Sequence, residues 1–215
     1  MNGPSRSDLS SGRGEIARLL HRLGWAAIAA AAFVGQPGRV AVGIPAALVA
    51  ADCLRQLGPL LAPGRRYIEW AAIAAGGAAT AAALSLAPTG PQPGFTAYFV
   101  VGSVAFSLYA LGLAAWVAPV DRGHLARRLR ASVAVWWVMA AIATVGFVSG
   151  TSTATPPDDG MTIGGRLVSD WLFFPLVGLM FVAYFLLAGA HHVVKTTMRE
   201  LAAEDSAAAQ ATGTA

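Results

Sequence analysis

Long stretches without charge constrain the fold of this chain more than any other feature of its sequence. No Asp, Glu, Lys or Arg occurs in residues 70–120, 131–157 or 171–194, and a shorter Ala-rich stretch, 25–38, is also uncharged. About 20 apolar residues in a helix cross the roughly 30 Å hydrocarbon core of a bilayer. With 56% hydrophobic and 12% charged residues, the chain is predicted to be an all-α, multi-pass protein of the cell membrane.

Turn-forming residues divide the apolar sequence into six predicted helices, because Pro and Gly stop helices between them. The predicted helices cover residues 17–35, 40–62, 67–87, 96–118, 129–149 and 168–194. The first has the shortest uncharged part, so residues 17–35 either span the membrane or lie on its surface as an amphipathic helix. The sequence therefore predicts a polytopic bundle of six transmembrane helices, with five as the alternative.

The positions of the basic residues predict the orientation of the bundle. Most Lys and Arg residues lie in four places, namely residues 6–22, 65–66, 122–130 and 195–199. The connections at 88–94 and 149–165 contain none. Because basic residues concentrate on the cytoplasmic side, both termini are predicted to be cytoplasmic, which requires an even number of spans. Arg39, in a predicted outer turn, is the exception.

The polar ends of the chain flank the predicted bundle. Residues 1–16 form a polar lead that contains the acids Asp8 and Glu15, which favours a retained helix over a cleaved signal peptide. Residues 17–195 form the bundle. Residues 196–215 are small and polar, with too little apolar surface to offset the entropy of ordering, so they are predicted to be a disordered cytoplasmic tail. The net charge of +4 reflects these membrane-flanking residues, so no nucleic-acid partner is expected.

A few ionisable residues fall within or at the ends of the predicted spans, where such groups are costly and are candidates for function. At 1.5 Å per residue, the deepest acid, Asp52, lies about 20 Å from the predicted outer turn, and four other groups share that depth. The predicted ligand-binding pocket, open to the cytoplasmic side, consists of His21, Asp52, Arg55, Glu69 and His191.

A purely structural role for these residues is the alternative. Asp52 and Arg55 are three residues apart on one helix face, where they can form an ion pair. Glu69 can pair with Arg65 or Arg66 in the same way. Histidines at helix ends commonly anchor a helix at the membrane surface.

No metal site or cofactor is expected from the sequence. It contains no zinc-ligand spacing, and its single cysteine, Cys53, excludes an internal disulfide. A b-type haem needs two axial nitrogens from facing helices, and His21 with His191 or His192 would supply them only at the membrane edge. We therefore expect neither haem nor metal.

One short motif resembles a known family. The sequence Arg66-Tyr67-Ile68-Glu69-Trp70 resembles the Arg-Tyr-x-acid-Trp signature on the third helix of microbial rhodopsins. The resemblance covers five residues. The chain departs from the family because its only lysine, Lys195, lies at the predicted cytoplasmic end rather than in mid-span, where a retinal Schiff base forms. The resemblance implies a rhodopsin-shaped bundle without retinal.

Two functions of different classes remain open, and the residues do not decide whether the chain is an enzyme. The first is a non-enzymatic bundle that transports a small solute or proton, or that serves as a membrane subunit or oligomer in a larger complex. The second is an intramembrane enzyme on a lipophilic substrate, such as an isoprenoid or terpene cyclase. In that enzyme Asp52 or Glu69 is the catalytic acid, and the faces of Trp70, Trp136 or Trp137 stabilise a cation.

Overall fold

The computed structural model describes residues 6–32, 40–84, 92–119, 124–149, 151–152, 161–163, 166–168 and 173–213. Six helices form the bundle: α1 (Arg6–Ala32), α2 (Val40–Leu57), α3 (Arg65–Leu84), α4 (Gln92–Val117), α5 (His124–Ser149) and α6 (Phe173–Gly213). The predicted helical architecture and the predicted number of helices are confirmed.

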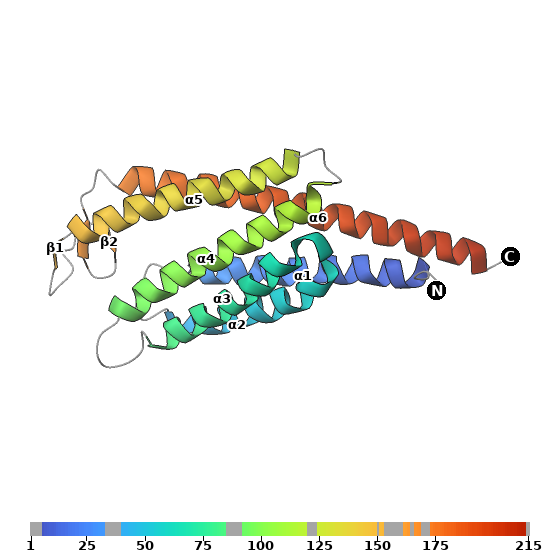
Figure 1. The fold of residues 1–215 in the computed structure, drawn as a ribbon, viewed down its shortest axis with the longest axis horizontal. Coiled ribbons are helices and arrows are strands. Elements are labelled where there is room, and N and C mark those ends of the chain that lie inside the picture. Colours follow the sequence, from blue (N-terminus) through green and yellow to red (C-terminus); the bar gives the residue numbers. More distant parts are fainter. Residues whose placement is uncertain are drawn as a thin grey trace.

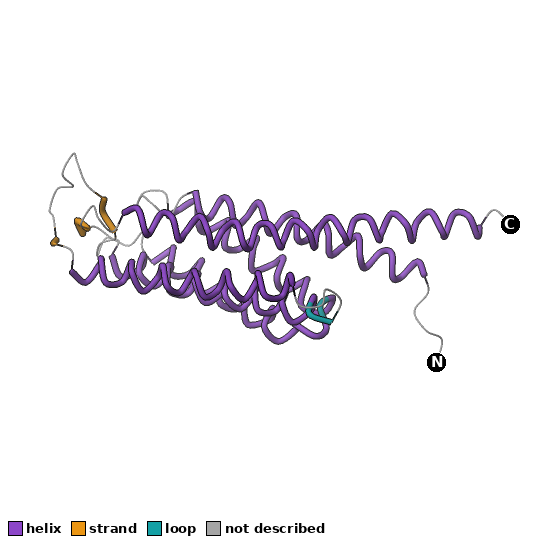
Figure 2. The backbone as a smooth tube through the Cα atoms, turned by 90° about the horizontal axis from the view of Figure 1, so that it is seen from above, coloured by secondary structure: helices purple, strands orange, loops and turns teal. Residues whose placement is uncertain are grey.

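The helices follow one another around the bundle. Each helix packs against its neighbours in the chain, and α6 also packs against α1. The long axes of all six run in broadly the same direction, and both termini lie at one end, which we call the terminal end (Figures 1 and 2). Two short 3-10 turns, η2 (Gly58–Leu60) and η3 (Ala62–Gly64), connect α2 to α3 at that end.

A small β-sheet lies between α5 and α6 at the opposite end of the bundle (Figure 2). Its strands are β1 (Thr151–Ser152), β2 (Met161–Ile163) and β3 (Arg166–Val168), in the order β1-β3-β2, and both pairings are antiparallel. The sequence analysis expected only a connection here. The two residues between β2 and β3 are both Gly, a pair typical of tight hairpins, and this was the available signal.

Small residues allow the helices of the core to approach closely. The buried face of α3 consists of Ile68 and six alanines. Gly64, the last residue of η3, packs against the backbone of Gly112 on α4, and a Cβ at Gly64 would collide with the Gly112 carbonyl. Leucines fill the wider gaps, and the fully buried ones are Leu19, Leu20, Leu57, Leu61, Leu113 and Leu129.

The outside of the bundle is apolar. Every helix carries at least one large apolar side chain that is half exposed or more; examples in helix order are Trp25, Leu48, Ile73, Val100, Val138 and Phe185. Soluble monomers rarely expose apolar surface so extensively. Three helical segments of the described chain, Ala62–Leu84, Ala97–Val117 and Gly178–Ala208, are long and apolar enough to cross a membrane. These findings support a membrane protein.

The end of the chain differs from its prediction. Residues 196–215 were expected to be disordered, but α6 continues as helix through Gly213. The segment after Lys195 is rich in Ala, which has the highest helix propensity, and it extends a helix that has already formed. The prediction from composition was wrong because extending an existing helix avoids the free-energy cost of nucleating a new one.

Some predicted features lie outside the described residues. These are the outer turn with Arg39 and residues 88–91 of the uncharged connection at 88–94.

The contact between Gly64 and Gly112 generates a stability prediction. Gly64→Ala should lower the free energy of unfolding by about 1–3 kcal/mol, because the added methyl group forces two backbones apart. The matched control is Gly76→Ala on α3, where nothing lies within 4 Å of the new Cβ, so it should be neutral or stabilising. Thermal unfolding in detergent measures both. Equal stability of the two variants would contradict the packing described here.

Candidate functional site

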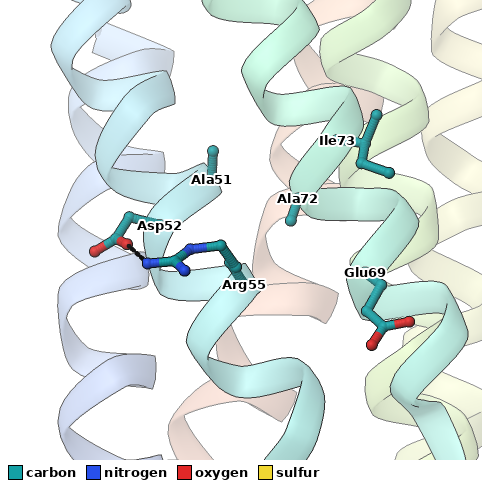
Figure 3. A pocket seen from close by; sticks show the side chains of 6 residues that line it. All are labelled: Ala51, Asp52, Arg55, Glu69, Ala72 and Ile73. Carbon is teal, nitrogen blue, oxygen red and sulfur yellow. Dashed lines mark hydrogen bonds and ion pairs between the residues drawn. The ribbon is translucent and has the colours of Figure 1, made fainter.

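Three of the five predicted ligand residues line one pocket between α2 and α3. Asp52, Arg55 and Glu69, with Ala51, Ala72 and Ile73, surround a hollow of about 470 Å³ (Figure 3). Both the α2 and the α3 residues lie within two turns of the terminal end. The structure therefore brings together the two acids and the arginine, but neither histidine.

Both carboxylate oxygens of Asp52 are already engaged. Oδ1 accepts a hydrogen bond of 3.1 Å from Nη2 of Arg55, and Oδ2 accepts one of 2.6 Å from Nε2 of Gln56. Figure 3 shows the guanidinium of Arg55 reaching back along α2 to the carboxylate. The structural alternative from the sequence, an ion pair within one helix, is present. Its side chains are 43% and 76% exposed, so water and salt screen the attraction.

Glu69 pairs within its own helix as well. Its Oε1 accepts a hydrogen bond of 2.6 Å from Nε of Arg65, one turn earlier on α3. In Figure 3 the carboxylate of Glu69 lies across the pocket from Asp52, and the two acids do not point toward each other. Neither acid is thus free to protonate a substrate without first giving up an arginine.

His21 lies on a different face, in a second hollow of about 580 Å³ between α1 and α2. Its ring meets Trp25 edge-on, with 6.3 Å between ring centroids. The residues on either side of the hollow are Arg22, Ala26 and Ala29 from α1 and Pro45, Ala46 and Val49 from α2. The bulk of α2 separates His21 from Glu69.

His191 lies inside the bundle. Its Nδ1 and the hydroxyl of Tyr109 on α4 are 2.7 Å apart, in hydrogen-bond contact. On the α1 side, the imidazole interacts with the backbone carbonyl of Leu20. Gly24 provides the space, because a Cβ there would lie only 3.4 Å from Nε2.

The sequence analysis did not find Tyr109, which is buried in the middle of an uncharged span. Tyrosine is common at membrane interfaces, whereas Tyr109 lies about two turns inside the end of α4. That unusual position was the available signal for a buried polar contact. Through Tyr109 and His191, one polar contact joins three helices: α1, α4 and α6.

Further polar and aromatic contacts join α4 to α5. The indole Nε1 of Trp137 donates to Oγ of Ser107 at 3.0 Å, and that hydroxyl donates to the carbonyl of Ser103 at 2.8 Å. Trp136 stacks on Phe106 and Phe99, with centroid distances of 4.7 and 6.3 Å. These aromatic rings lie on α4 and α5, whereas the two candidate acids lie on α2 and α3.

Among the described residues, no three His, Cys, Asp or Glu side chains come close enough to hold a metal ion. No protein-family model, curated protein or solved structure matches the chain.

The exposure of the Asp52–Arg55 pair generates a second prediction. A double-mutant cycle with Asp52→Ala and Arg55→Ala should give a coupling energy of only about 0.2–1 kcal/mol, because the pair is solvent-accessible and within one helix. The coupling should also decrease with added salt. Unfolding in detergent at low and high salt measures it. A coupling above about 3 kcal/mol, typical of a buried pair, would show that the pocket is closed to water in the membrane.

Proposed function

We propose that the chain is a six-span membrane protein with its terminal end in the cytoplasm. The described basic residues support this orientation, since nearly all of them lie in residues 6–22 of α1, the last turn of α2, the first two turns of α3 and α5, and the distal part of α6; Arg166 in β3 is the exception. All of these helical segments meet at the terminal end in Figure 1. Positive residues concentrate on the cytoplasmic side of membrane proteins.

The position of α1 supports six spans over five. A surface helix would cross the end of the bundle, whereas α1 runs along it and packs between α2 and α6. Its buried side chains, which include Leu19, Leu20 and Leu23, belong to the same core as Leu54 and Leu57 of α2. An interfacial α1 would leave this leucine face without partners.

Within that framework we propose a non-enzymatic function in proton handling, centred on Tyr109 and His191. The observation that carries this proposal is the hydrogen bond between two titratable side chains inside a bundle with an apolar exterior. Ionisable groups placed inside membrane bundles are expensive and usually functional. An imidazole and a hydroxyl in direct contact can pass a proton between them. The other titratable groups acting on the ring are His21 on α1 and His192 and Lys195 on α6.

The contacts favour this function over the cyclase. Cyclase chemistry needs a free acid beside an aromatic cavity, but Asp52 is bound by Arg55 and Gln56, and Glu69 by Arg65. The stacked rings of Phe106 and Trp136 belong to other helices.

One observation favours a second candidate, a membrane subunit of a larger complex. Helices α1 and α6 both extend past the other four at the terminal end, as Figures 1 and 2 show. Together the protruding ends of α1 and α6 form a polar surface to which another subunit could bind. Deleting residues 201–215 should then reduce the size of the native complex extracted from membranes, while the bundle stays folded.

Cysteine labelling tests the membrane topology. Single cysteines at Gly12, Ala62 and Ser206 in a Cys53→Ser background should resist an impermeant maleimide in intact cells, because all three lie at the terminal end. A cysteine at Thr151, in β1 at the opposite end, should react from outside. Opposite labelling of positions 12 and 206 would indicate an odd number of spans and overturn the six-span model.

Proton flux tests the proposed site. In sealed liposomes containing a pH-sensitive dye, Tyr109→Phe should reduce the rate of proton entry per folded molecule at least about fivefold, the equivalent of one hydrogen bond. His191→Gln should do the same. The matched control on the exposed face of α6, Tyr184→Phe, should leave the rate unchanged. Absence of flux with the wild-type protein would contradict the proposal, as would variants that lose only thermal stability.

A further inference from the structure

The hollow between α1 and α2 differs from the pocket between α2 and α3 in the charge it carries. Its lining contains two groups that can bind an anion, His21 and Arg22, and no acid. In the other pocket, Asp52 pairs with Arg55 and Glu69 with Arg65. Two hollows therefore flank α2, one lined by paired charges and one lined by basic groups without an acid.

Arg22 makes no hydrogen bond or ion pair with any described residue. Arg18, one turn earlier on α1, is paired, since its Nη2 lies 2.6 Å from Oε1 of Glu15. The hydrogen bond from Arg18 holds the pKa of the Glu15 carboxyl below its usual range, so this pair persists at neutral pH. The nearest acid on α2, Asp52, is one turn beyond Val49 and is occupied by Arg55 and Gln56. The guanidinium of Arg22 is thus available to an external anion.

The rest of the hollow is apolar and elongated. From Arg22 it passes Trp25 and Ala26 to Ala29, a rise of about 10 Å along α1. Pro45, Ala46 and Val49 form the α2 side, and their small size leaves the space between the helices open. Trp25 is 63% exposed at the charged end, and indole rings prefer the boundary between headgroups and acyl chains.

We propose that this groove binds an anionic phospholipid of the cytoplasmic leaflet. Arg22 and His21 bind the phosphodiester, and one acyl chain lies against Ala26, Ala29, Ala46 and Val49. The long side chain of Arg22 reaches toward the headgroup layer while its aliphatic part stays against the helix. A guanidinium can donate two parallel hydrogen bonds to phosphate oxygens. This inference rests on the membrane placement proposed above.

Native mass spectrometry of the full-length protein tests the proposal, with phosphatidylglycerol and phosphatidylcholine as probes. We expect phosphatidylglycerol to be retained in preference to phosphatidylcholine, and Arg22→Gln to weaken its retention about tenfold or more. Arg18→Gln is the matched control, because it removes the same charge one turn away, where Glu15 already neutralises it. Ala29→Phe, which fills the groove, should weaken binding with Arg22 intact. Millimolar inorganic phosphate should not displace the lipid.

Each other outcome overturns a defined part of the proposal. Equal loss with Arg18→Gln and Arg22→Gln would show general attraction to a basic surface, and displacement by inorganic phosphate would show a simple anion site. Retention of lipid by Ala29→Phe would show that the acyl chain of the lipid does not lie in this groove. Carbonate extraction of cell membranes keeps the two proposals apart. If the protein resists extraction but binds no lipid, only the proposed lipid binding is wrong. If carbonate extracts the protein, the proposed membrane placement is wrong.

Discussion

Close backbone contact between helices is the constraint on which the rest of this bundle depends. Lipid is as apolar as leucine, so burying apolar surface gives little drive for helix association, and tight van der Waals packing must replace it. The approach of Gly64 to Gly112 and the alanine face of α3 provide that packing. Large apolar side chains, such as Leu57, fill the interior away from these close contacts, and others, such as Ile73 and Phe185, lie on the outside.

Polar groups are divided between the rim of the bundle and its interior. At the rim, Asp52 and Glu69 are neutralised within single helices, which limits the cost of placing carboxylates near lipid. In the interior, the contact between Tyr109 and His191 joins helices that are far apart in the chain. Arg22 belongs to neither group, because its charge is left without a partner in the described protein. Pairing, rather than position along a span, distinguishes the structural charges from those available to a ligand.

The sequence predicted the helices well because uncharged length and Pro-Gly breaks are local signals. It also predicted the pair of Asp52 and Arg55, whose spacing of three residues determines their contact. It could not predict that His191 faces Tyr109 while His21 faces the hollow between α1 and α2, since those directions depend on the rotation of α6 and α1 about their axes. All the candidate groups were predicted to lie at one depth in the membrane. Depth alone does not determine the direction in which each side chain points around its helix axis. Tertiary packing alone determined which groups met.

The uninterrupted length of α6 has a mechanical consequence. Its 41 residues form one rod of about 60 Å, from the small sheet to the far tip of the terminal end. The rod is held by α5 on one flank and α1 on the other, so those contacts act as a fulcrum. A helix without a break resists bending, and a tilt of roughly 10° about that fulcrum would move a point about 30 Å away by about 5 Å. A small tilt at one end of α6 would therefore be transmitted to the other end.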